Sequence, residues 1–202
     1  MLTSFLGWVF RTVATAAEAE LNDDTALREQ LLEAEMRREM GEISDEEFRA
    51  QLVIKDRLID YWRDVDRNGA LCALEYYTQD CVYIMCDHRM EGHADIKRYY
   101  DYRASRGDRL VRHVASNLRV HVHAPDRASL EGILCVYACD GLPIQPSSPP
   151  ILVADIACEF VRGPDEQWCF RMHQLIPLFA GGVEVLVPPG PGHQSIRPTG
   201  AE

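Results

Sequence analysis

The chain has 202 residues, of which 47% are hydrophobic, and a formal net charge of -11. This length suits one domain of ordinary size with an extension. The acidic balance argues against binding to nucleic acid or to anionic membrane surfaces, because both need a basic footprint. Residues 1–50 hold 12 acidic and 5 basic side chains, so the first quarter of the chain differs in composition from the rest.

The cysteines and histidines bear on location and on metal binding. The seven cysteines are odd in number, include no Cys-x-x-Cys pair and mostly sit in apolar runs, which favours free thiols in a reducing cytoplasm. His88 and His93 flank an expected turn, and His121-x-His123 lies on one strand face, but neither set has a cysteine or carboxylate at zinc spacing. Glycine-rich nucleotide motifs and nucleophile elbows are also lacking. We therefore expect no metal and no other cofactor.

Three helical segments are expected at the N-terminus. Apolar residues at helical spacing predict an amphipathic helix over 2–19. Arg11 interrupts this apolar run, which is short for a membrane span, and the segment lacks the leading basic region of a signal peptide. We expect at most a peripheral or assembly contact through it. A second helix is expected over 25–40, and Ser44-x-x-Glu47 is a capping box that opens a third.

The character of the sequence changes near residue 54. We expect a helix over 54–67, a short helix over 71–78, a strand over 80–86 and a helix over 93–106. Four strands follow at about 110–123, 128–139, 151–162 and 167–177, separated by turn residues. Helices followed by an antiparallel meander indicate an α+β fold. The chain is thus divided into a helical extension (1–52), a main domain (53–180) and a Gly/Pro-rich tail (181–202).

Several short motifs of the main domain recur together, in this order, in one family. They are Tyr61-Trp62-x-x-x-Asp66, Cys81-Val82-Tyr83, Glu91-Gly92-x-x-x-Ile96, Arg112-His113-x-x-x-Asn117 and Trp168. On these motifs, about residues 54–180 resemble the SnoaL-like domains of the nuclear transport factor 2-like (NTF2-like) superfamily. The resemblance implies a cone in which a curved antiparallel sheet wraps around N-terminal helices and leaves a deep apolar pocket.

The resemblance also implies that Asp66 and His113 form a catalytic pair. Histidine is a natural general base near neutral pH, and a nearby carboxylate would fix its tautomer and stabilise the imidazolium. In similar dehydratases and lyases such a pair removes a proton without metal or organic cofactor. The other interpretation is that Asp66 ends its helix and His113 is a polar rim residue, since members of one fold often differ in function.

The strand that carries His113 raises a geometric difficulty. The odd positions of residues 113–123 are polar, while the even ones are mostly apolar. A regular strand would therefore place His113 on the face opposite Val114, Leu118 and Val120. Either the strand bulges or bends between 113 and 118, or the polar face itself lines the pocket.

Further substrate-binding candidates are Tyr61, Tyr83, Asn117, Tyr137, Asp155 and His173. In similar dehydratases a tyrosine on the strand of Tyr83 faces a substrate oxygen, although core packing explains a buried tyrosine equally well. Asp155 is the single charge within residues 151–158, so if buried it needs a partner, for which Arg171 and His173 are candidates; a structural ion pair is the alternative. Some similar lyases carry an acid on the strand equivalent to 128–139, where this chain has Tyr137, Ala138 and Cys139.

Two functions fit these observations. The first is a cofactor-independent lyase, isomerase or cyclase that acts on a small hydrophobic carbonyl compound of polyketide or steroid type, in a homo-oligomer such as a dimer. The second rests on the string from Gly41 to Phe48 and the apolar first helix with Trp8, because about residues 1–52 resemble the gas vesicle protein G family. In that case the protein is a noncatalytic binding or assembly module.

Overall fold

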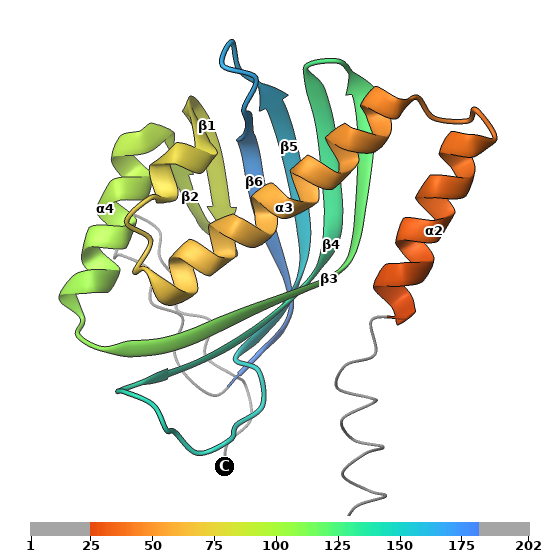
Figure 1. Ribbon diagram of the computed structural model, residues 1–202. Helices are drawn as coiled ribbons and strands as arrows, with labels where there is room; N and C mark the ends of the chain where they lie inside the picture. The colour runs from red at the N-terminus through yellow and green to blue at the C-terminus, as the bar shows by residue number, and fades with distance from the viewer. Residues whose placement is uncertain (1–24, 182–202) are drawn as a thin grey trace, which may run out of the picture. The chain divides into compact units, whose positions relative to one another are not determined.

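The computed structural model describes residues 25–181. By its backbone contacts the chain divides into two compact units, with the boundary between Phe48 and Arg49. Within the first unit lie α2 (Thr25–Glu39) and the start of α3 (Asp45–Arg67). The second unit holds the rest of α3, a short 3-10 helix η1 (Ala73–Tyr76), α4 (Gly92–Ser105) and six strands (Figure 1).

Helix α3 begins with the cap that the sequence predicts. The Ser44 hydroxyl accepts a hydrogen bond from the backbone N–H of Glu47 at 3.0 Å. Three acidic residues in the first turn face the positive end of the helix dipole, which stabilises this end. The helix then runs 23 residues without a break, so the separate helix expected over 54–67 is its C-terminal part. The reason is that residues 45–67 contain neither glycine nor proline.

The six strands form one sheet in the order β2-β1-β6-β5-β4-β3. They are β1 (Tyr77–Met85), β2 (His88–Glu91), β3 (Arg109–Ala124), β4 (Arg127–Asp140), β5 (Leu152–Arg162) and β6 (Trp168–Ala180). Neighbours are antiparallel except for β1 and β6, which run parallel. The sequence did not indicate β2, because the strand has only four residues and Met90 is its one apolar side chain.

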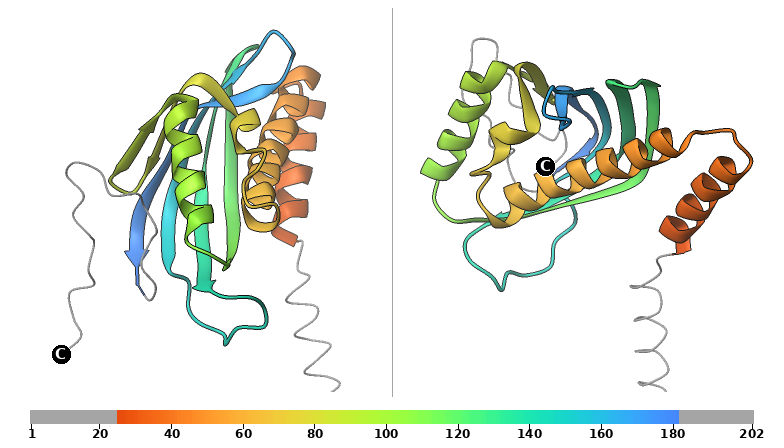
Figure 2. Two further views of the ribbon diagram at one scale, coloured as in Figure 1. Left: turned by 90° about the vertical axis from the view of Figure 1, so that its left-hand side faces the viewer. Right: turned by 45° about the horizontal axis from the view of Figure 1, so that its top comes forward.

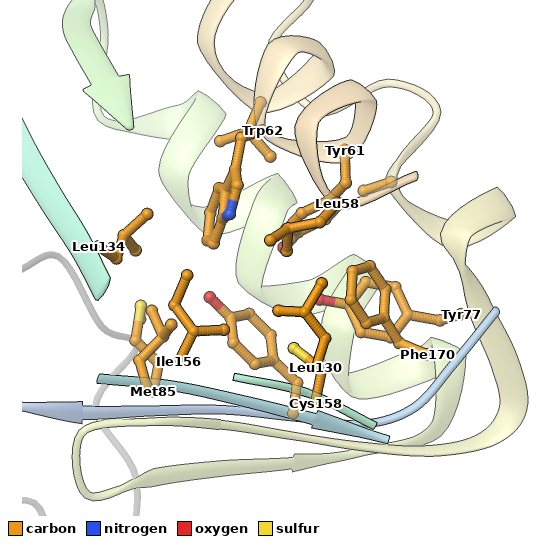
Figure 3. Packing of buried hydrophobic residues seen from close by; sticks show 14 of the residues in the cluster. Leu58, Tyr61, Trp62, Tyr77, Met85, Leu130, Leu134, Ile156, Cys158 and Phe170 are labelled. Atoms are coloured by element: carbon orange, nitrogen blue, oxygen red, sulfur yellow. The ribbon is translucent and has the colours of Figure 1, made fainter. Parts of the chain in front are cut away.

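Helices cover the concave face of this curved, unclosed sheet (Figures 1 and 2). Leu58, Tyr61 and Trp62 project from α3 towards the strands, where they meet side chains such as Ile156 and Phe170 (Figure 3). Helix α4 packs against β1 and β2 at the other side of the concavity. On β5 every second residue from Leu152 to Phe160 is buried, as expected for a strand with one face on a core. The predicted α+β cone is therefore confirmed.

A β-bulge in β3 resolves the difficulty over His113. The pairing of β3 with β4 shifts register between Ser116 and Arg119, and Asn117 between them has a φ of 53°. Asparagine tolerates this left-handed conformation better than most residues. The bulge changes which positions face the core: before it they are Val111, His113 and Ala115, and after it they are Leu118, Val120 and Val122. Of the two alternatives, the structure has the bulge.

Gly132 on β4 tests how rigid this bulge is. A Cβ atom at position 132 would lie 2.6 Å from Leu118 Cδ2 and 3.0 Å from the backbone oxygen of Ser116. Gly132→Ala should therefore lower the free energy of unfolding by about 1–3 kcal/mol, the usual cost of overpacking, as measured by urea denaturation. Gly181→Ala is the control, because no described atom lies within 4 Å of its added Cβ. An unchanged midpoint for Gly132→Ala would contradict a fixed bulge.

Candidate functional site

Asp66 and His113 are in direct contact. Asp66 Oδ1 lies 2.6 Å from His113 Nδ1, and Asp66 Oδ2 accepts a hydrogen bond of 2.9 Å from the backbone N–H of His113. Both side chains are nearly buried, with 8% and 9% of their surfaces exposed. A carboxylate can only accept, so Nδ1 carries the imidazole proton and Nε2 keeps its lone pair. The contact predicted from the sequence is confirmed, while its catalytic role stays a prediction.

The surroundings of His113 keep its imidazole neutral. Burial lowers its pKa, the hydrogen bond and charge of Asp66 oppose this, and the charge of Arg103 lowers the pKa further. Trp62 covers one face of the ring, with ring centroids 4.1 Å apart and planes 16° from parallel. A neutral histidine held in one orientation, with Nε2 unprotonated, has the form required of a general base.

His113 lines a pocket of about 50 Å³ within the second unit. Its walls come from α3, α4 and five strands of the sheet, all except β2. Most of the lining is apolar, and the polar groups other than His113 and Trp62 are Tyr83, Tyr99, Tyr100, Arg103 and Arg109. Among the side-chain nitrogen and oxygen atoms of residues 25–181, only Trp62 Nε1 and His173 Nε2 are fully buried without a hydrogen-bond partner, so His113 Nε2 is not sealed within the core.

A group of buried phenols adjoins the pocket. The hydroxyls of Tyr61 and Tyr100 are 2.5 Å apart, and the Tyr77 hydroxyl lies 2.8 Å from His173 Nδ1. Burial raises the pKa of Tyr61, Tyr77 and Tyr83 well above the ordinary value. These phenols therefore stay neutral and can donate hydrogen bonds at any physiological pH. Of these phenols, Tyr83 and Tyr100 belong to residues that line the pocket.

His173 lies in the core rather than in the pocket wall. Its ring is fully buried and stacks on Tyr83 and Phe170, with centroids 4.6 Å and 4.7 Å away. Burial, and secondly the charge of His113, lower its pKa to about 3. His173 is thus a neutral packing residue whose Nδ1 pairs with the Tyr77 hydroxyl.

The remaining predicted residues are spread over the domain. Tyr61 is buried behind the pocket and reaches it through Tyr100. Asn117 is exposed at the bulge, and Tyr137, with 41% of its surface exposed, pairs with Arg112 across β3 and β4. Neither lines the pocket.

Asp155 does not have the partners expected for it. It lies opposite Ile133 and Ile176 in the sheet. Arg171 instead pairs with Asp80 at 3.4 Å, and His173 packs in the core. A partner was expected only if Asp155 were buried, and the structure leaves its side chain partly exposed.

Sequence reasoning missed the contribution of α4. Tyr99, Tyr100 and Arg103 of this helix all line the pocket. Their spacing of three and four residues places them on adjoining parts of one helix face, which was the available signal. Within residues 25–181 no group of three or more His, Cys, Asp or Glu side chains is placed to hold a metal ion. In the same residues no helix has the length and apolar character needed to cross a membrane.

Comparison with solved structures identifies the fold. A putative scytalone dehydratase from Novosphingobium aromaticivorans aligns with a TM-score of 0.62 and 17% identity, over 76% of this chain and 100% of that chain. An NTF2-like protein with a cystatin-like fold from the same organism gives 0.53 and 19%, over 78% and 90%. ActVI-ORFA from Streptomyces coelicolor gives 0.52 and 12%, over 63% and 96%. The second unit thus has the NTF2-like, cystatin-like fold.

The N-terminal part of the chain matches a different family. The model for gas vesicle protein G matches residues 3–60, as the resemblance of the first 52 residues predicted. The match covers less than a third of the chain and ends within α3. No curated protein matches the sequence.

The role of Asp66 in setting the protonation of His113 can be measured. Because Asp66 raises the pKa of His113 against the effect of burial, Asp66→Asn should lower that pKa further. Titration of the histidine ring signals by NMR gives the value directly. Asp60→Asn, an exposed position on the same helix, is the control and should leave the pKa unchanged. A pKa that rises or stays constant in Asp66→Asn would contradict the described contact.

Acid sensitivity should report on His173. The unfolded chain binds a proton there near pH 6.5, whereas the folded chain does so only at about 3, so the unfolded state takes up more protons as the pH falls. Stability should drop across this window by about 1.4 kcal/mol per pH unit for one such group. His173→Phe should make the slope shallower, measured by urea denaturation at several pH values. The exposed His123→Phe should leave it unchanged; equal slopes for all three proteins would be evidence against the described burial.

Proposed function

We propose that the second unit is a cofactor-independent acid–base enzyme, a dehydratase-like lyase or isomerase for small hydrophobic carbonyl compounds. One observation carries this proposal: the nearly buried, neutral His113 is held through Nδ1 by Asp66, which leaves Nε2 available at the wall of an apolar pocket. The likeness of the fold to a putative scytalone dehydratase supports the same class of reaction.

The proposed reaction begins with removal of a proton from the carbon next to the substrate carbonyl. His113 Nε2 takes this proton, and Asp66 stabilises the resulting imidazolium through the 2.6 Å contact. The electron pair of the C–H bond moves to the carbonyl oxygen, which accepts a hydrogen bond from the phenol of Tyr83 or Tyr100. When the enolate collapses, a β-hydroxyl departs with the proton from Nε2 and forms water. Return of the proton to another carbon would give isomerisation.

A second candidate function is supported by the match of residues 3–60 to gas vesicle protein G. Here residues 1–52 would attach a noncatalytic domain to a larger assembly, and the domain would hold a ligand or form a dimer. The division into residues 1–52, 53–180 and 181–202, homo-oligomer formation and a cytoplasmic location remain predictions. Enzymatic turnover with hydrophobic substrates distinguishes the two candidates.

Elimination from hydrophobic β-hydroxy ketones tests the enzyme proposal. The wild-type protein should convert members of such a panel to conjugated enones, which absorb in the ultraviolet. His113→Gln should reduce the rate by about 10²–10⁴-fold, the usual contribution of a positioned acid–base group. His121→Gln, an exposed position on the same strand, should have no effect. If the wild type eliminates no water from any member, the assembly function is favoured instead. If His113→Gln is as active as the wild type, the role proposed for His113 is wrong.

A further inference from the structure

The charges at the pocket wall are all positive. Among the lining residues only Arg103, Arg109 and His113 can carry a positive charge, and no carboxylate lines the pocket. Asp66, which contacts His113, is not part of the lining. The whole chain carries a formal net charge of -11, so this pocket is an exception to the acidic character of the protein.

The two arginines differ in how their charge is balanced. Arg109, at the start of β3, forms an ion pair of 2.8 Å with Asp140 at the end of β4. Arg103 on α4 has no carboxylate partner among residues 25–181, and the groups that act on its pKa are the phenols of Tyr99, Tyr100, Tyr61 and Tyr83. Its guanidinium lies 5.8 Å from the centre of the Tyr100 ring. A neutral phenol can accept a hydrogen bond from the guanidinium, but it does not neutralise the positive charge of that group.

An unbalanced guanidinium is costly at this position. Arg103 is partly buried, and the other walls of the pocket are made of side chains such as Met85, Val111 and Leu152. Taking a charge partly out of water without an opposite charge beside it is unfavourable. An arginine is moreover the side chain best suited to bind a planar carboxylate through two parallel hydrogen bonds.

We propose that this pocket binds a small carboxylic acid with an apolar body, and that Arg103 pairs with its carboxylate. The apolar lining takes the body of the molecule, and Arg109 at the same wall adds positive charge that attracts an anion. The free volume of about 50 Å³ is smaller than the roughly 150 Å³ of a cavity that binds benzene. An acid with one ring therefore fits only if the pocket widens, and Met85 in its wall is a flexible side chain that can move.

This inference rests on the proposed function for one point, that the acid is also the substrate. The binding of an anion by Arg103 does not depend on turnover. If His113→Gln loses elimination while the wild type binds acids no better than amides, the enzyme proposal stands and the inference about Arg103 fails. If the wild type prefers acids but eliminates no water, the inference about Arg103 stands and the enzyme proposal fails.

Binding of matched acid and amide pairs tests the inference. Benzoate with benzamide and phenylacetate with phenylacetamide differ little in shape but differ in charge, and calorimetry gives the dissociation constant of each. The wild type should bind the acids about 10- to 100-fold more tightly than the amides, the usual difference made by a charged hydrogen-bonded pair. Arg103→Met should remove this preference and leave amide binding unchanged, whereas Arg103→Lys should retain part of it.

Arg98→Met is the matched control on the same helix. Its side chain is 69% exposed and pairs with Asp95, so the preference for acids should persist. Equal binding of acid and amide by the wild type would overturn the proposal, as would the absence of binding by both members of every pair. Because these two outcomes are read from the wild type, they do not depend on how Arg103→Met folds. Retention of the full preference in a folded Arg103→Met would also overturn it.

Discussion

The bulge at Asn117 is the constraint on which the arrangement of the site depends. A strand alternates its side chains between two faces, so a regular β3 could not direct both His113 and Leu118 towards the concave side. The single extra residue changes this alternation, and the left-handed conformation of Asn117 absorbs the change. Gly132 on β4 provides the space for it, since a side chain there would collide with Leu118 and with the backbone of Ser116. His113 and apolar core residues such as Leu118 can therefore share one face of one strand.

Much of this architecture could be predicted because its signals are local. Strand-forming runs between turn residues located the long strands. The alternation along residues 113–123 left two alternatives open, a bulge or a polar face that lines the pocket. The pairing of Asp66 with His113 was different in kind: 47 positions separate them, and only a resemblance brought them together. The contact of Tyr61 with Tyr100 was out of reach because it depends on how α3 and α4 meet over the sheet, and that of Tyr77 with His173 because it depends on the parallel pairing of β1 with β6.

The interior around the site combines polar atoms with very little charge. Tyr61, Tyr77, Tyr83 and Tyr100 are all buried, and burial raises the pKa of each so that the phenols remain neutral. His173 is held neutral by the same effect acting on a base. Hydrogen bonds between these groups satisfy most of their polar atoms without creating a buried ion. Of the charged groups near this region, Asp66 and Arg103 are those that act on the pKa of His113.

Helix α3 connects the two parts of the sequence that resemble different families. The match to gas vesicle protein G ends at residue 60, beyond the unit boundary after Phe48. Ile54 and Leu58 fall within this match, yet both are fully buried in the core of the second unit. Trp62 and Asp66 follow on the same uninterrupted helix, one stacked on His113 and the other bonded to it. The matched segment therefore cannot be separated cleanly from the cone: its last turns supply part of the core on which the orientation of Asp66 depends.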